Sequence, residues 1–317
     1  MKNIVIVMPC YNEEESLPYT IKALESVRQK LSRNYNLDFL FVNDGSADNT
    51  QTVIEQASKN SSHIYYRQFS HNAGHQSALR AGINASIGYD AVIMMDADLQ
   101  HPPELIAEML NAWEKGAAIV QMIRQDSAKE TGALRYVIGR IYYRIIAAIT
   151  DLKLEYGASD FRLIDKAVAK TVFSSPESDL FLRGYFSWLP VARTTIDYKP
   201  AKRVAGTSKY SLKKLLDLAY QSVLQFSEKP LRIAVTIGLI MALLSFVYGV
   251  VLVILHFTGA HTVSGWISLM VVMLFCFGLN FILLGIIGNY LAHSISIQKK
   301  RPEFIVAREK LPKFKHE

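Results

Sequence analysis

Cysteine is nearly absent from this sequence of 317 residues. Cys10 lies close to the amino terminus and Cys276 lies in a long apolar segment, and the chain has no others. Two isolated thiols can form neither a disulfide framework nor a cysteine-based metal site. A glycine-rich phosphate-binding motif is also missing after the first apolar run, which continues as Pro9-Cys10-Tyr11-Asn12-Glu13-Glu14. This absence argues against an ordinary dinucleotide-binding or P-loop enzyme.

Charge is missing from two long segments near the carboxyl end. Apart from Arg232 at its beginning, Leu231–Leu255 contains no Asp, Glu, Lys or Arg, and neither does Trp266–Leu291. At a rise of about 1.5 Å per residue, either segment is long enough as a helix to cross a hydrocarbon core of about 30 Å. The sequence therefore predicts two transmembrane helices. The alternative is a pair of helices buried in a soluble bundle.

The residues that flank these segments predict their orientation. The connection Phe257–Gly265 has no Lys or Arg, whereas basic residues precede the first segment (Lys209, Lys213, Lys214, Lys229 and Arg232) and follow the second (Lys299, Lys300 and Arg301). By the positive-inside rule, we expect a multi-pass protein of the cell membrane with both termini in the cytoplasm. The amino terminus lacks the longer apolar region of a signal peptide. The net charge of +7 fits an anionic membrane better than a nucleic acid, so no nucleic-acid partner is expected.

Short apolar runs alternate with helical patterns in the amino-terminal part. Ile4–Met8, Phe39–Val42 and Ala91–Met95 have the composition of buried strands, and Ser16–Lys30 has the apolar spacing of a helix. This alternation predicts an α/β fold with a mainly parallel sheet. Ligands bind at the carboxyl ends of such strands. The polar residues expected at that edge are Asn12, Glu13, Asp44, Asp96 and Asp98.

Asp96 and Asp98 directly follow an apolar run and are two residues apart. Carboxylate ligands without His or Cys suit Mg²⁺ or Mn²⁺, and these ions usually bridge to substrate phosphates. The alternative is a polar strand end that caps the helix beginning at Pro102-Pro103. His71, His75 and His101 lack the spacing of a zinc site.

Two segments have the pattern of basic amphipathic helices. Leu134–Ile149 carries an apolar stripe beside arginines, and Ser211–Ser227 carries one beside lysines. Such helices can rest on a membrane surface. The alternative is that each packs its apolar face on the domain core.

Several motifs occur in order along the chain. They are Pro9-Cys10-Tyr11-Asn12-Glu13-Glu14, Val42-Asn43-Asp44-Gly45-Ser46 with Asp48 and Thr50, Asn72-Ala73-Gly74-His75, Asp96-Ala97-Asp98-Leu99-Gln100-His101-Pro102-Pro103, Ser159 to Asp165, and Arg203 with Gly206-Thr207-Ser208-Lys209-Tyr210. Together with the paired apolar segments, they resemble the inverting glycosyltransferases of family two. More narrowly, they are similar to the polyprenyl-phosphate glycosyltransferases, in particular the bacterial branch that glucosylates undecaprenyl phosphate and is related to dolichyl-phosphate mannose synthases.

The resemblance covers nearly the whole chain and implies its organisation. It implies a nucleotide-diphospho-sugar transferase domain with the GT-A, Rossmann-like fold at residues 1–207 and an amphipathic interface helix at 208–229. Two transmembrane helices with a short external loop would follow at 230–293, and a cytosolic basic tail at 294–317.

The resemblance also implies a donor site. The nucleotide-sugar residues would be Pro9, Tyr11, Asn12, Glu13, Asp44, Asp96 and Gln100, and the metal ligands would be Asp96, Asp98 and Gln100. Asp44 matches the carboxylate that contacts the base, although Asn43-Asp44-Gly45-Ser46 is also ordinary turn chemistry. A divalent ion would stabilise the negative charge of the leaving diphosphate.

On the acceptor side, Asp160 matches the family's catalytic carboxylate, and Asp98 is the other residue expected in catalysis. A phosphate monoester with a second pKa near ~6 is already largely dianionic at neutral pH, so a strong base is hardly required. The alternative for Asp160 is an ion pair with Arg162. The candidate cations for the acceptor phosphate are Arg124, Arg135, Arg203 and Lys209, each of which could instead be a solvated surface charge. Arg183 and Trp188 fall in a segment that resembles the sugar-site loop, with a core position as the alternative for Trp188.

The expected reaction is transfer of a hexose, first of all glucose from UDP-glucose, to polyprenyl phosphate at the cytoplasmic membrane face. Alternative donors are GDP-mannose and a UDP-linked amino sugar or aminoarabinose-type sugar. A non-catalytic membrane scaffold is the alternative from another class, which the intact Asp96, Asp98 and Asp160 oppose. The sequence leaves open whether the chain forms a homo-oligomer.

Overall fold

The structure is a computed structural model that describes residues 1–125, 149–150, 152, 155–177, 180–201, 222–258 and 265–312. Within these residues, one mixed sheet contains β1 (Lys2–Cys10), β2 (Tyr35–Asn43), β3 (Ile64–Phe69), β4 (Ala91–Met94), β5 (Ile119–Arg124), β6 (Ala158–Asp165), β7 (Arg193–Tyr198) and β8 (Val306–Lys310). The helices are α1 (Leu17–Leu31), α2 (Thr50–Asn60), α3 (His75–Asn84), α4 (Ile106–Glu114) after the 3-10 turn η1 (Pro103–Leu105), α7 (Lys166–Ser174), α8 (Leu182–Trp188), α10 (Lys229–Phe257) and α11 (Trp266–Gln298).

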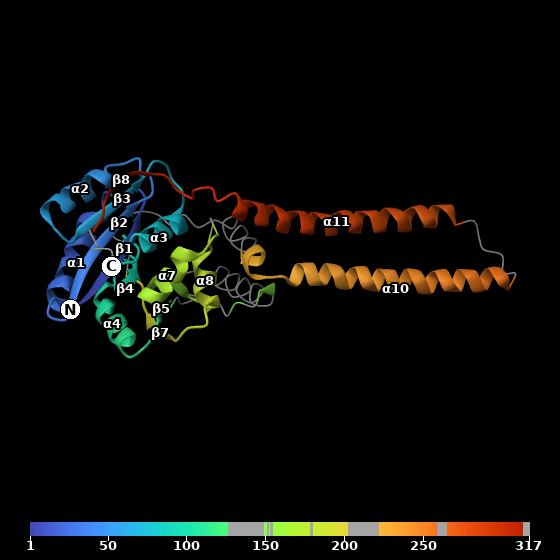
Figure 1. Ribbon diagram of the computed structural model, residues 1–317, viewed down its shortest axis with the longest axis horizontal. Coiled ribbons are helices and arrows are strands. Elements are labelled where there is room, and N and C mark those ends of the chain that lie inside the picture. The colour runs from blue at the N-terminus through green and yellow to red at the C-terminus, as the bar shows by residue number, and fades with distance from the viewer. Residues whose placement is uncertain are drawn as a thin grey trace.

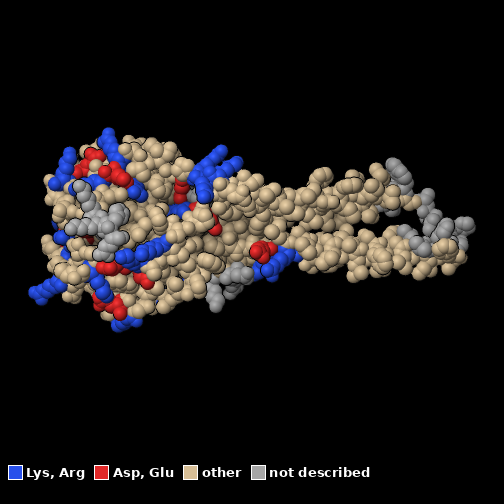
Figure 2. All heavy atoms as spheres, viewed as in Figure 1, with Lys and Arg blue, Asp and Glu red and all other residues tan. Residues whose placement is uncertain are grey.

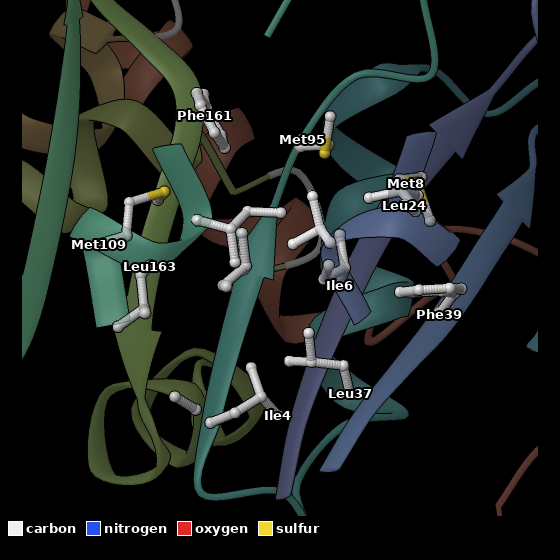
Figure 3. Close-up of a cluster of buried hydrophobic side chains, with 14 of the residues drawn as sticks. Ile4, Ile6, Met8, Leu24, Leu37, Phe39, Met95, Met109, Phe161 and Leu163 are labelled. Carbon is white, nitrogen blue, oxygen red and sulfur yellow. The ribbon is translucent and has the colours of Figure 1, made fainter. Parts of the chain in front are cut away.

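The sheet has an apolar core on each face, because alternate residues of its central strands point to opposite sides. On β1, Ile4, Ile6 and Met8 join one core, while Val5 and Val7 join the other. Helices α1, α2 and α4 cover the first core, and α3, α7 and α8 cover the second. Figure 3 shows the first core, where side chains from β1, β2 and β6 meet those of α1 and α4. Burial on both faces explains why these strands are near-continuous apolar runs.

The strand order is β7-β5-β6-β4-β1-β2-β3-β8. β1 lies between β2 and β4 and is parallel to both, and β2 is also parallel to β3. The predicted α/β fold with a parallel centre is therefore confirmed. The sheet becomes mixed because β6 runs antiparallel to β4 and β5, and β8 runs antiparallel to β3. The chain crosses from β1 to neighbours on both sides, which is where open α/β sheets form a ligand crevice.

Helices α10 and α11 extend together away from the sheet (Figure 1). The windows Lys229–Val251 and Leu269–Gln298 have mean hydropathies of 2.3 and 2.6, so each helix is long and apolar enough to cross a membrane. Their large apolar side chains, such as Phe246 and Phe281, are exposed, which contradicts the alternative of helices buried in a soluble bundle. In Figure 2 the charged residues lie over the globular part and at the base of the two helices. A contiguous apolar surface of this extent is unusual on a soluble protein and indicates an interaction with a membrane or another apolar partner.

After α11 the chain returns to the sheet. β8 pairs with the edge strand β3, with Tyr66 opposite Lys310 and Gln68 opposite Arg308. The sequence predicts only a basic tail at residues 294–317, so this strand is an addition. Of the predicted amphipathic helix at 134–149, only Ile149 is described. Of the one at 211–227, only Ser222 to Ser227 are described, and residues 222–226 are helical.

Candidate active site

The loops that follow β1 and β2 are joined by hydrogen bonds. The backbone N–H of Asn12 donates to Ser46 Oγ at 3.0 Å, and Asn12 Oδ1 accepts from the N–H of Ala47 at 2.9 Å. The N–H of Glu13 donates to Thr50 Oγ1 at 2.8 Å. Asn12 has a φ of 55°, a left-handed conformation that Asn tolerates better than most residues. The sequence-predicted Asn12 and Glu13 thus lie at one edge of the sheet, next to the exposed Tyr11 and the buried Pro9.

Asp44 organises the loop that leads into α3. Its Oδ1 accepts from the N–H groups of Ala73 at 2.6 Å and Gly74 at 3.2 Å, and its Oδ2 accepts from Gly74 at 3.0 Å. The loop before α3 lies so close to Gly45 that a Cβ there would be 2.5 Å from the carbonyl carbon of His71. Gly45 also has a φ of 65°. Burial raises the pKa of Asp44, and the hydrogen bonds from Ala73 and Gly74 partly offset this effect. The contact of Asp44 with a base stays a prediction.

Asp96, Asp98 and Gln100 lie on the tight loop after β4. Asp98 Oδ1 accepts from the N–H of Gln100 at 3.1 Å, and Leu99 between them has a φ of 59°. The N–H of Asp96 donates to His101 Nδ1 at 3.0 Å, which leaves the proton of a neutral ring on Nε2, 3.7 Å from Asp96 Oδ2. His101 is itself fixed by stacking on Phe161, with ring centroids 4.9 Å apart. These contacts hold the predicted metal-binding loop in one conformation.

This loop fits a divalent cation. The Oδ1 atom of Asp96 is buried and has no hydrogen-bond partner in the described structure, although burying a carboxylate oxygen without one is costly. Groups of three or more His, Cys, Asp or Glu that could form a complete metal cage are not found among the described residues. Mg²⁺ needs no such cage, because one or two carboxylates, water and substrate phosphates complete its shell. The unpartnered oxygen of Asp96 is compatible with such a site, and the assignment of Asp96, Asp98 and Gln100 as metal ligands stays a prediction.

Asp160 lies at the start of β6, on the strand next to β4. Arg183 of α8 grips its carboxylate with two hydrogen bonds, from Nε to Oδ1 at 2.8 Å and from Nη2 to Oδ2 at 2.7 Å. His75 Nε2, at the first residue of α3, lies 3.2 Å from Asp160 Oδ2 and 3.7 Å from Asp96 Oδ1. Burial acts to raise the pKa of Asp160, but the charge and hydrogen bonds of Arg183 and the hydrogen bond of His75 hold it well below its ordinary value. Asp160 is thus an ion-paired carboxylate and a weak proton acceptor.

His75 lies between Asp96, a predicted metal ligand, and Asp160, the predicted acceptor-side carboxylate. Burial acts to lower the pKa of His75, but the hydrogen bond to Asp160 and the charges of Asp96 and Asp160 raise it overall. The sequence singled out His75 only as part of a motif, because nothing in its spacing shows that the first turn of α3 faces β6. The resemblance to a sugar-site loop flagged Arg183, and the structure now gives it a partner.

The structure contradicts two alternatives from the sequence, the ion pair of Asp160 with Arg162 and the core position of Trp188. The structure pairs Asp160 with Arg183 and His75, whereas the Arg162 guanidinium lies over the ring of Phe186, 4.6 Å from its centroid. The ion pair observed for Asp160 is therefore with Arg183, not with Arg162 as in the alternative. Trp188 is 59% exposed, so its assignment to the core is wrong.

The candidate cations for the acceptor phosphate are only partly described. Arg124, the last residue of β5, directs Nη1 to Gln100 Oε1 at 3.3 Å and so lies beside the loop that carries Asp98. Arg135, Arg203 and Lys209 lie outside the described residues. Their assignment to the acceptor phosphate stays a prediction.

The paired carboxylates after β4 and the ion-paired Asp160 on β6 thus lie close together at one edge of a mixed sheet. Residues 5–173 match the family model described as glycosyl transferase family 2. The chain belongs to this family, is a glycosyltransferase, and has its GT-A-like fold.

Individual relatives match nearly the whole chain. An uncharacterized glycosyltransferase, YkcC, of Bacillus subtilis is 36% identical over 96% of this chain and 93% of its own. The bactoprenol glucosyl transferase of Shigella phage SfV is 34% identical over 97% of this chain and 99% of its own. Among solved structures, glucosyl-3-phosphoglycerate synthase from Mycobacterium tuberculosis, in complex with Mn²⁺, UDP and phosphoglyceric acid, is 15% identical with a TM-score of 0.47 over 70% of this chain and 76% of that one.

Proposed function

We propose that the protein transfers a hexose, first of all glucose from UDP-glucose, to a polyprenyl phosphate with inversion at the cytoplasmic face of the cell membrane. The observation that carries this proposal is that His75 lies between Asp96, which is beside Asp98, and Asp160. The same chain continues into two helices that are long and apolar enough to cross a membrane. The similarity to the bactoprenol glucosyl transferase of phage SfV over nearly the full length supports a polyprenyl phosphate acceptor and a glucose donor.

Asp96 and Asp98, with Gln100, would hold Mg²⁺ or Mn²⁺, which supplies positive charge for the leaving diphosphate when it is bound. Arg124 already contacts Gln100 and would add a cationic donor on the same side. The loops of Asn12, Glu13 and Asp44 would receive the nucleotide, since they line the same edge of the sheet.

The acceptor phosphate would attack without the help of a strong base. One of its oxygens forms a bond to the anomeric carbon while the bond from that carbon to the diphosphate breaks, and the electron pair leaves with the nucleotide. Attack from the side opposite the leaving group inverts the anomeric centre. Because Arg183 holds the pKa of Asp160 well below its ordinary value, Asp160 acts by orienting the sugar or the acceptor through Arg183 and His75.

The return of the chain to the sheet supports the membrane topology. α10 leaves the domain that contains β1, and the chain after α11 pairs β8 with β3 of the same sheet. A helical pair with both ends on one domain either crosses a membrane twice or does not cross it. The basic residues at both ends of the pair favour the cytoplasm for the domain.

The test is a transfer assay with the purified full-length protein in lipid nanodiscs. The protein is incubated with Mg²⁺, undecaprenyl phosphate and, in turn, UDP-glucose, GDP-mannose and a UDP-linked amino sugar, and the lipid product is identified by mass. We expect a lipid-linked hexose with UDP-glucose and none in nanodiscs without undecaprenyl phosphate. Release of nucleotide without any lipid-linked sugar would refute the acceptor, and a product with another donor only would refute glucose.

A further inference from the structure

The segment that follows α11 is anchored to the catalytic domain at several points. The carbonyl of Ile305 accepts from the N–H of Ser70 at 2.9 Å, and the ring of Phe304 stacks on Phe69 with centroids 4.7 Å apart. β8 then continues along β3, where Arg67 forms an ion pair of 2.8 Å with Glu309. The end of the helical pair is therefore fixed relative to the sheet.

A further contact links this segment to α3, the helix that begins at His75. Glu303 lies three residues before β8. Its Oε2 accepts a hydrogen bond from Nη1 of Arg80 at 3.2 Å, and both side chains are largely buried. Arg80 belongs to α3, the helix whose first residue is His75. Its guanidinium also donates from Nη2 to the carbonyl of Ser175 at 2.9 Å and from Nη1 to the carbonyl of Glu177. Arg80 thus holds an acidic side chain from one segment and two backbone carbonyls from another.

The two carbonyls belong to the stretch between α7 and α8. Four residues after its described end at Glu177 the chain reaches Phe181, whose N–H donates to Gln225 Oε1 at 3.0 Å, just before α10. α8 begins there, and its second residue is Arg183, the partner of Asp160. The approach to α8 is therefore held by residues that flank both membrane helices, by Gln225 before α10 and through Arg80 by Glu303 after α11.

We propose that Arg80 is a positioning residue for sugar transfer, which ties the segment after α11 to the approach of α8 and so sets the position of Arg183 on Asp160. This role rests on the proposed function, because it assigns a task to Asp160 in the transfer. Arg80 suits the task because a planar guanidinium can bind a carboxylate and two carbonyls at once, which a lysine ammonium on a flexible stem does less well. A change in the position of the helical pair relative to the domain would thereby change the position of Arg183 at Asp160.

The test compares Glu303→Gln with Glu309→Gln. Both variants neutralise one acid that ties the chain after α11 to an arginine of the domain, but only Glu303 faces Arg80. In hydrogen–deuterium exchange on the full chain in nanodiscs, we expect faster exchange at residues 180–189 in Glu303→Gln and unchanged exchange there in Glu309→Gln. Arg80→Lys should reproduce the effect of Glu303→Gln, and the double variant should be no worse than either, because the two residues act through one contact.

Transfer kinetics provide the second measurement. Loss of a charged hydrogen bond predicts a fall in kcat of roughly tenfold for Glu303→Gln and Arg80→Lys, with the dissociation constant for UDP-glucose changed less than about twofold. Equal exchange at 180–189 and equal kcat in Glu303→Gln and Glu309→Gln would overturn the proposal. A wild-type protein that makes no lipid-linked sugar would refute the proposed function instead, and the exchange data would still show whether Arg80 couples the two segments.

Discussion

Arg183 offers the sharpest test of how Asp160 acts. In the structure two charged hydrogen bonds join Arg183 to Asp160, and both groups are largely shielded from water, with 21% and 7% of their side chains exposed. Arg183→Lys keeps the charge but cannot make both bonds in the same geometry. Arg183→Ala removes both and leaves the buried carboxylate with His75 as its other described partner.

The magnitudes follow from the number of bonds lost. A hydrogen bond to a charged group contributes about 1.5–3 kcal/mol, so loss of one predicts that Arg183→Lys lowers kcat/KM by roughly 10- to 100-fold. For Arg183→Ala we expect a loss of stability of about 3 kcal/mol, near the low end for breaking a buried ion pair, because His75 still contacts the carboxylate. Kinetics for both substrates and urea unfolding of the detergent-solubilised protein measure the two quantities.

Arg193→Lys is the matched control. Arg193 also binds α8, since its Nη2 donates to the carbonyls of Phe186, Ser187 and Leu189 at 2.9 to 3.2 Å, but it makes no described contact with Asp160. We expect kcat/KM to change less than about threefold in this variant, as for most surface changes. If Arg183→Lys retained the activity of Arg193→Lys, Arg183 would have no part in the reaction and our account of Asp160 would be wrong.

Three further predictions concern the metal, the topology and the acceptor. Asp98→Ala should abolish transfer while the circular dichroism spectrum stays unchanged, and excess chelator should stop the parent protein; full turnover with chelator would contradict a metal-dependent reaction. A cysteine at Thr262 should react with an impermeant reagent added outside the cell and one at Lys315 should not, since the positive-inside rule puts only the former outside; the opposite labelling would reverse the orientation. Arg203→Ala should raise the KM for polyprenyl phosphate or lower kcat, with little change in UDP-sugar binding and partial rescue by lysine; a sharp loss of UDP-sugar binding alone would assign Arg203 to the donor site.

The centre of the sheet could be predicted because its signal is local. β1, β2 and β4 are buried on both faces, so each is a near-continuous apolar run that needs no knowledge of its neighbours. Asp44, Asp96 and Asp98 could be placed at one edge for the same reason, because parallel strands bring their carboxyl ends together. β7 and β8 lie at the edges of the sheet and are mostly exposed, so their sequences lack an apolar pattern.

The contacts around Asp160 could not be predicted, because they depend on which helix faces which strand. Arg162 is closer in sequence to Asp160 than Arg183 is, yet the Arg162 guanidinium stacks on Phe186 while α8 brings Arg183 to the carboxylate. β8 joins β3 across more than two hundred residues, and this pairing is available only because the chain turns back through α10 and α11.

The same return of the chain bears on the role of the two apolar helices, α10 and α11. A pair of helices that served only as an anchor would need one covalent connection to the domain. Here the chain leaves next to Gln225, which binds the backbone of Phe181, and comes back through Glu303, which binds Arg80. Both contacts meet at the approach to α8, the helix that supplies Arg183 to Asp160. If the acceptor is a polyprenyl phosphate, as we propose, it must reach Asp160 from the membrane. The residues that connect the two helices to the domain would then also position Arg183 and Asp160 relative to the bilayer surface.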